Sequence, residues 1–191
     1  MRDTQVRFAQ KSDRDQLARL RAMRWPESSA GEHGQELRLI LGGQFPGVMP
    51  PMILVAQAGD GTLAGFLEAG LRWYADGCEA RYPVGYMDGW YVAENWRQQG
   101  IGTELLRAAE DWARSQGCIE MASDTAIHNQ VSQRVHQALG FEIVERSVRL
   151  QTCTGGRFLV QGVPEIKLIA DLRPAMVRTG QRRSAAPAGH V

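Results

Sequence analysis

The sequence has few cysteines and no long apolar run, and each shortage excludes a class of protein. Its three cysteines, Cys78, Cys118 and Cys153, match no zinc-binding or redox spacing and cannot all pair. We therefore expect free thiols in a reducing, cytoplasmic setting. No stretch of about 18 apolar residues occurs, and charges interrupt the N-terminal segment, which predicts neither a membrane span nor a signal peptide.

An excess of either charge is also missing, which argues against nucleic acid as the main partner. The chain holds 22 Lys and Arg against 21 Asp and Glu, a formal net charge of +1. Lysine itself is scarce, since Lys11 and Lys167 are the two lysines and the other basic residues are arginines. Partners therefore have to be inferred from where each sign of charge lies.

The size and composition predict one globular domain. The chain has 191 residues, of which 43% are hydrophobic and 23% charged. We expect residues 1–172 to fold as that domain. From 173 to 191 the sequence contains no acid and little to bury, which predicts a disordered basic tail.

Hydrophobic periodicity predicts alternating strands and helices. Ser12 and Asp15 mark a helix start, Trp25-Pro26 its end, and Gly117 the end of the most strongly helical segment. In chain order the expected elements are strand 4–9, helix 12–25, helix 32–41, strands 52–58, 62–73 and 83–92, helix 101–116, strand 118–123, helix 128–139, strand 141–151, and further strands at 157–161 and 166–172. This order predicts a mixed α/β sheet with helices on both sides and a central βαβ unit over 86–123.

The most specific feature is the segment Arg97-Gln98-Gln99-Gly100-Ile101-Gly102-Thr103, at the start of the expected helix 101–116. Glycines there let backbone N–H groups approach a phosphate, and the helix N-terminus carries about half a positive charge. A Walker loop would need Gly-Lys-Ser/Thr, and a dinucleotide fingerprint would need glycine in place of Leu105. A tight turn that only leads into the helix is the alternative interpretation.

The flanking residues extend this segment into a longer pattern. The preceding strand ends in Gly89-Trp90-Tyr91-Val92, and Asn129, Ser132, His136 and Gly140-Phe141 follow at the spacing N-x-x-S/A-x-x-x-Y/H-x-x-x-G-F. Together they resemble the acetyl-CoA signature of the GNAT N-acetyltransferases. The resemblance implies the GNAT fold, a twisted and mostly antiparallel sheet of six to seven strands with about four helices. It also implies acetyl-CoA as co-substrate and no metal.

The same resemblance assigns cofactor contacts along the chain. The pyrophosphate would be held by the loop, and the pantetheine arm by the preceding strand and by the helix that follows. The implied cofactor-binding residues are Trp90, Tyr91, Val92, Arg97, Gln98, Gln99, Gly100, Ile101, Gly102, Thr103 and Asn129.

Five stretches between about residues 4 and 150 are similar to aminoglycoside 6′-N-acetyltransferases. They are LRAMRWPE, RWYADGC, DGWYV, GCIEMASDT and HQALGFEIVER. The resemblance implies an aminoglycoside acetylated at its 6′-amine, a role in antibiotic resistance, and a homodimer in which Tyr74 reaches the partner's site. The implied substrate contacts are Trp25, Tyr74, Asp88, Asp124 and Glu145. Carboxylates also suit an acceptor that carries several ammonium groups.

Each substrate candidate also has a structural interpretation. Trp25 could simply pack at a helix end, Asp124 could begin a turn or cap a helix, and Glu145 could face solvent on an exposed strand. Asp88 is harder to explain structurally, because an unpaired carboxylate inside a sheet is costly. Tyr74 stands in a loop one residue longer than the resemblance leads us to expect.

The expected mechanism is direct transfer without a covalent acyl-enzyme. Asp88 is the expected base, through a water, and a backbone N–H near Tyr91 or Val92 the expected oxyanion donor. His136 stands where many GNAT enzymes have a tyrosine acid, and of its two interpretations we favour a packed or capping helix histidine over an acid. Two alternatives remain, a GNAT enzyme that acetylates a peptide or polyamine, and a non-catalytic acyl-CoA sensor.

Overall fold

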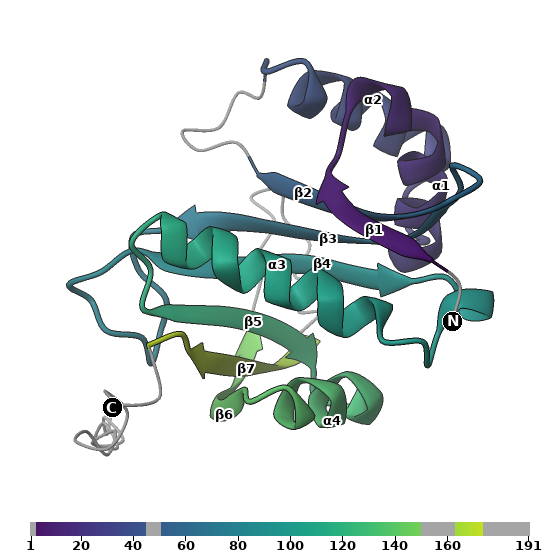
Figure 1. Ribbon diagram of the computed structural model, residues 1–191. Helices are drawn as coiled ribbons and strands as arrows, with labels where there is room; N and C mark the ends of the chain where they lie inside the picture. Colours follow the sequence, from purple (N-terminus) through teal and green to yellow (C-terminus); the bar gives the residue numbers. More distant parts are fainter. Residues whose placement is uncertain (1–2, 45–50, 150–162, 174–191) are drawn as a thin grey trace, which may run out of the picture.

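A computed structural model describes residues 3–44, 51–149 and 163–173. Within this part of the chain, seven strands form one sheet in the order β1-β2-β3-β4-β5-β7-β6, with four α-helices against it (Figure 1). The strands are β1 (Thr4–Phe8), β2 (Met52–Ala58), β3 (Leu63–Arg72), β4 (Val84–Val92), β5 (Glu120–Ala126), β6 (Glu142–Arg149) and β7 (Val163–Asp171), and the helices are α1 (Arg14–Arg24), α2 (Ala30–Leu41), α3 (Ile101–Ser115) and α4 (Gln130–Ala138).

The sheet is mostly antiparallel, as expected. Its one parallel pair joins β4 to β5, and α3 is the crossover between them. Strand β7 inserts between β5 and β6, antiparallel to both. The mixed α/β fold and the central βαβ unit are therefore confirmed.

Apolar side chains place helices on both faces of the sheet. On one face, Leu105 and Leu106 of α3 pack with Met121 of β5 in the larger core cluster. On the other, Leu17 of α1 and Leu37 of α2 pack over β2 and β3 in a second cluster. Because helices pack on both faces, the centre of the sheet is rigid. Polar side chains at the strand ends are therefore held on a rigid support.

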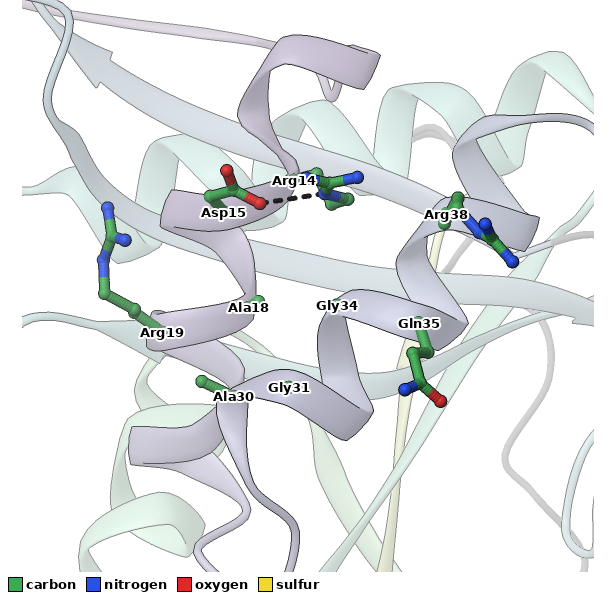
Figure 2. Close-up of a pocket in the computed structure, with 9 residues that line it drawn as sticks. All are labelled: Arg14, Asp15, Ala18, Arg19, Ala30, Gly31, Gly34, Gln35 and Arg38. Carbon is green, nitrogen blue, oxygen red and sulfur yellow. Dashed lines mark hydrogen bonds and ion pairs between the residues drawn. The ribbon is translucent and has the colours of Figure 1, made fainter.

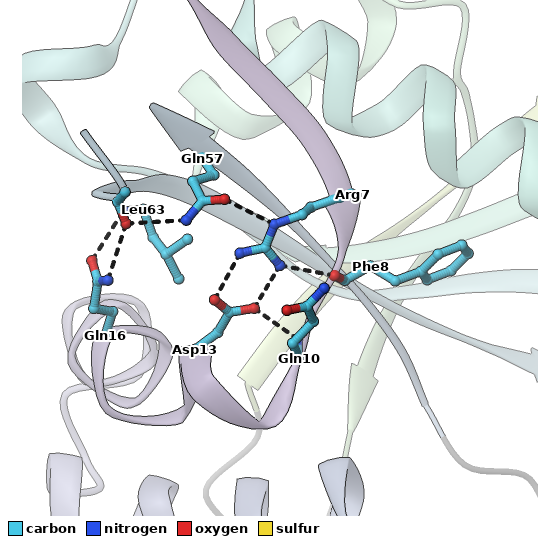
Figure 3. Close-up of polar contacts among 8 residues, drawn as sticks. Arg7, Phe8, Gln10, Asp13, Gln16, Gln57 and Leu63 are labelled. Carbon is cyan, nitrogen blue, oxygen red and sulfur yellow. Dashed lines mark hydrogen bonds and ion pairs between the residues drawn. The ribbon is translucent and has the colours of Figure 1, made fainter. Parts of the chain in front are cut away.

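The start of α1 differs from the expectation at Ser12. A short 3-10 turn, Lys11–Asp13, precedes the helix, and the Asp13 carboxylate accepts the backbone N–H of Gln10 at 2.7 Å. The two Arg7 amino nitrogens donate to the same carboxylate at 2.7 and 2.8 Å (Figure 3). The Arg7 hydrogen bond lowers the pKa of Asp13. Asp13, the N-cap residue of α1, makes no side-chain capping bond to the helix and is instead held by Arg7 of β1, a contact that the Ser12–Asp15 spacing does not predict.

The start of α2 also lies earlier than expected. Ser29 caps it, because its hydroxyl accepts the Glu32 backbone N–H while the Glu32 carboxylate accepts that of Ser29. The remaining elements agree with their predicted order, with β5 extending to Ala126. The strand expected at 157–161 and the basic tail lie outside the described residues. None of the described helices is both long and apolar enough to cross a bilayer.

Candidate active site

A cleft opens where β4 and β5 separate. Their parallel pairing runs from Val84 opposite Glu120 to Met87 opposite Ser123 and stops there, although both strands continue. The separation leaves backbone groups of the last part of β4 without a partner on β5. A cavity of about 710 Å³ lies at this point, lined by β4 from Met87 onwards, by the start of α3 and by α4.

A β-bulge in β4 places Asp88 in this cleft. Glu68 of β3 pairs with Gly89 and the next residue, Ala69, pairs with Met87, so Asp88 is the extra residue. The bulge also changes which side chains face α3, because Met87 and Trp90 both pack on that side. Asp88 and Trp90 therefore reach the cleft from opposite faces of one strand.

The loop before α3 has the backbone geometry of an anion cradle. Gln98 and Gly100 have positive φ angles of 60° and 84°. An ideal Cβ on Gly100 would meet no described atom within 4 Å, so glycine is favoured there by the positive φ rather than by a close contact. Ile101, Gly102 and Thr103 line the cleft from the first turn of α3, where backbone N–H groups lack helical acceptors.

The second glycine of the loop has a different role. A Cβ on Gly102 would lie 2.9 Å from the Trp90 ring, so glycine here lets α3 approach β4. Arg97 donates from Nε to the Val92 carbonyl at 3.0 Å, and this contact ties the loop to the end of β4. The predicted loop residues other than Gln99 line one end of the cleft. Gln99 does not line it, and its Nε2 donates to the Asn95 carbonyl at 3.1 Å.

Helix α4 closes this end with Asn129 and His136. The Asn129 side-chain oxygen caps α4 by accepting the Ser132 N–H at 3.1 Å. His136 is 3% exposed, and its Nδ1 lies 2.8 Å from the Ser132 carbonyl, which can only accept. Burial lowers the pKa of His136. The neutral ring therefore carries its proton on Nδ1, which leaves Nε2 an acceptor and argues against an acid role.

Two polar atoms near His136 lack partners among the described residues. They are Nε2 of His136 and Nε1 of Trp90, both buried. The two rings meet edge to face with their centroids 5.6 Å apart. Both residues line the cleft, so a donor and an acceptor are available there to a bound molecule.

The opposite, acidic end of the cleft is lined by Asp88 and Asp124, and Arg72, a cation that the sequence analysis missed, contacts it from outside the lining. Asp88 accepts from Arg72 of β3 at 2.9 Å, and the guanidinium lies 3.1 Å from the Tyr86 ring centroid. The Tyr86 hydroxyl donates to the Asp124 carboxylate. Burial raises the pKa of Asp88 whereas Arg72 lowers it, and burial raises the pKa of Tyr86, which keeps the phenol a donor.

Lys167 of β7 is a second cation on this face. It pairs in register with Asp124 on one side and with Glu145 on the other, and its Nζ lies 2.8 Å from Asp76. The Tyr74 hydroxyl donates to the same Asp76 at 2.8 Å. Glu145 and Tyr74 are therefore near this face but are not among the residues lining the cleft, which include Asp88 and Asp124.

Trp25 lies against the floor of the acidic end. A Cβ on Gly89 would collide with its ring, so Trp25 packs directly on β4 beside Asp88. The Arg21 guanidinium lies 5.3 Å from the Trp25 ring centroid and pairs with the buried Glu68 at 3.0 Å. Burial raises the pKa of Glu68 to about 7. Trp25 therefore has the packing role that the sequence analysis considered, and it also lies next to Asp88, where it could contact a substrate.

Several residues of the site were not predicted from the sequence. A signal existed for Glu68, a charge inside the apolar strand LAGFLEAGL, but none for Arg72 or Tyr86, whose importance depends on neighbouring strands. Arg24 also lines the cleft, from the end of α1.

A separate hollow of about 590 Å³ lies between α1 and α2, away from these residues (Figure 2). Arg14, Arg19 and Arg38 line it, and Arg14 pairs with Asp15 at 2.8 Å. It contains none of the predicted site residues. Within the described residues no group of three or more His, Cys, Asp and Glu side chains could hold a metal ion.

Comparison with known proteins agrees with this geometry. Residues 17–141 match the model of the acetyltransferase (GNAT) family. An aminoglycoside N(6′)-acetyltransferase type 1 from Klebsiella aerogenes is 39% identical over 136 residues, covering 71% of this chain and 88% of the relative. One from Stenotrophomonas maltophilia is 38% identical, covering 75% and 89%.

Solved structures give the same result for the fold. The aminoglycoside N-acetyltransferase AAC(6′)-Iy in complex with CoA superposes with a TM-score of 0.71 at 33% identity, covering 80% of this chain and 96% of that one. AAC(6′)-Ih from Acinetobacter baumannii gives 0.70 at 31%, covering 80% and 100%. The same AAC(6′)-Iy is also solved with a bisubstrate analogue, CoA-S-monomethyl-acetylneamine. The chain therefore belongs to the GNAT acetyltransferase family, and its relatives within that family are aminoglycoside N(6′)-acetyltransferases.

Proposed function

We propose that this protein transfers the acetyl group of acetyl-CoA to the 6′-amino group of aminoglycosides. The observation that carries the proposal is one cleft with an exposed helix N-terminus at one end and an acidic end that includes Asp88 of β4 at the other. A polyanionic donor and a polycationic acceptor would meet there. The relatives' names point to the same pair of substrates.

The residues of the loop suit acetyl-CoA. The first-turn amides of α3 and the open space at Gly100 would receive the pyrophosphate, with Arg97 beside it. The last part of β4, Trp90 to Val92, would pair with the pantetheine arm, because its backbone is unpaired on the β5 side. Asn129 would contact the arm from α4. Acetyl-CoA supplies a thioester whose carbonyl carbon accepts the amine while the C–S bond breaks.

The chain's own part in the reaction is to orient the amine and to take its proton. Asp88 is the proposed base, through one water, and the C–N bond forms as the thiolate leaves. A backbone N–H of Tyr91 or Val92 would stabilise the oxyanion. His136 is not proposed as the acid, because its Nε2 carries no proton at neutral pH. A CoA-type thiolate, with a pKa near ~8.5, leaves without that help.

Trp25, Tyr74, Asp124 and Glu145 are the remaining proposed acceptor contacts. Asp124 lines the cleft, whereas Tyr74 does not line it and is 63% exposed. We propose a homodimer in which Tyr74 reaches the partner's site. The free thiol of the buried Cys118 suits a cytoplasmic enzyme.

A thiol-release assay with acetyl-CoA tests the proposal. We expect release with kanamycin and tobramycin and none with an aminoglycoside that lacks the 6′-amine. Spermine and a peptide with a free amine serve as controls. Thiol release with spermine or the peptide alone would assign a different acceptor. If none of these amines causes thiol release, the protein is an acyl-CoA sensor and not an acetyltransferase.

A further inference from the structure

Arg72 occupies the position where the acceptor's charge would have to go. It ends β3, pairs with Val84 across the sheet, and its Nη2 donates to Asp88 Oδ1 at 2.9 Å. The other face of the guanidinium lies on the Tyr86 ring. The proposed base is thus already paired with a cation from its own chain.

This contact is an open one. The Arg72 and Asp88 side chains are 45% and 44% exposed, in contrast to the Arg21–Glu68 pair, which is 7% and 6% exposed. An exposed ion pair contributes about 0–1 kcal/mol, so a competing cation can replace it at little cost. The Tyr86 ring remains a cation–π surface for the guanidinium if the carboxylate is taken.

We propose that Arg72 is a positioning residue that holds Asp88 ionised in the free enzyme and occupies the acceptor's ammonium subsite until the substrate displaces it. The inference rests on the proposed function, since it identifies how that acceptor site is kept before substrate arrives. In the free enzyme the Arg72 guanidinium takes the place of the acceptor's ammonium group. An acceptor must therefore compete with Arg72 for Asp88, which weakens its binding.

Other charged groups near Asp88 also affect its pKa, some in the same direction as Arg72 and some in the opposite direction. Asp124, held by Tyr86, raises the pKa of Asp88, and the buried Glu68 on the neighbouring strand interacts with it. Lys167 acts on Asp124 from β7. The groups around Asp88 are, from β3, Glu68 and Arg72; from β4, Tyr86; from β5, Asp124; from β7, Lys167; and from α1, Arg24. Among these groups, Arg72 forms an ion pair with Asp88 at 2.9 Å.

The test is Arg72→Gln, with carboxyl ¹³C NMR of Asp88 in the free enzyme and calorimetric binding of kanamycin. We expect the pKa of Asp88 to rise by about 1 unit, because an opposite charge at hydrogen-bond distance is removed. At pH 8 we expect the kanamycin Kd to fall about two- to fivefold, because no internal cation competes for Asp88. Arg72→Lys should restore both values toward wild type.

Arg81→Gln is the matched control, since Arg81 is an exposed arginine paired with Glu79. It should leave the pKa of Asp88 unchanged. In the wild type, kanamycin should shift the ¹⁵N signal of the Arg72 side chain, a measurement that needs no variant to fold. An unchanged pKa of Asp88, weaker kanamycin binding at pH 8, or an Arg72 signal that kanamycin does not move would each overturn the inference.

The two proposals fail separately. If the wild type acetylates kanamycin but Arg72→Gln behaves like Arg81→Gln, the role of Arg72 is wrong and the function stands. If the wild type releases no thiol with any aminoglycoside, the function is wrong, and the substrate-competition part of the inference falls with it. The pKa of Asp88 in the free enzyme would then still decide whether Arg72 keeps it ionised.

Discussion

The two ends of the cleft are built in different ways. The end proposed to bind phosphate, called the phosphate end, is formed by residues of one short segment, 97–103, of which all but Gln99 line the cleft, and it would act through backbone N–H groups. The acidic end consists of side chains from β3, β4, β5 and β7 that meet only in the folded sheet. A backbone site is specified locally, whereas a side-chain site depends on strand register. Substitutions should therefore affect one end without the other.

The largest effect is expected for Asp88→Asn at the acidic end. Loss of the base should lower kcat/KM for kanamycin by about 10²- to 10³-fold, the range of general acid–base catalysis. The CoA dissociation constant should stay within about twofold, because the loop is untouched. Steady-state thiol release and calorimetry measure the two. Asp111→Asn on α3, an exposed carboxylate paired with Arg114, is the control; full activity in Asp88→Asn would disprove the assignment.

Glu68→Gln tests the buried acid beneath the acidic end. Its pKa is raised from 4.5 to about 7 in the fold, so between these values the folded state binds a proton that the unfolded state has lost. Stability therefore falls as pH rises through this window, by up to about 3 kcal/mol. Glu68→Gln should remove that part of the slope in urea unfolding at pH 5 and pH 8. An identical pH dependence in both proteins would contradict it.

Gly100→Ala probes the phosphate end against a matched position. Gly100 and Gly117 both have φ of +84° and open space for a Cβ, but they lie at opposite ends of α3. Each alanine should cost about 1–2 kcal/mol of stability, the strain of a left-handed residue. Gly100→Ala alone should weaken CoA binding, by about tenfold, while kanamycin binding is kept. Equal CoA affinity in both variants would show that the loop does not hold the cofactor.

The smallest effect is expected for the cysteines, of which the two described ones, Cys78 and Cys118, do not line the cleft. Cys118 is buried among apolar residues and burial raises the pKa of its thiol, so it is a packing residue. Replacing Cys78 and Cys153 with serine and Cys118 with alanine should change kcat by less than about twofold, with a few degrees lost from Tm. A folded triple variant without turnover would indicate a covalent intermediate.

Particular residues show which features of the structure could be predicted from the sequence and which could not. The βαβ unit and α3 were predictable because apolar spacing and Gly117 are local signals. The cap of α1 was not, because Arg7 of β1 fixes Asp13 across the sheet edge. Asp88 could be named as a candidate, but the bulge that turns it into the cleft is a matter of pairing between β3 and β4. The roles assigned to Tyr74 and Glu145 stay predictions.

The sequence by itself determined the order of strands and helices and the phosphate loop, since these depend on neighbouring residues and on backbone conformation. Only the tertiary structure decided which charges meet. Arg72 and Asp88 are 16 residues apart in the chain, and Lys167 faces Asp124 from a strand inserted between β5 and β6. Periodicity carries no information about such contacts, because strand order and register alone bring these side chains together.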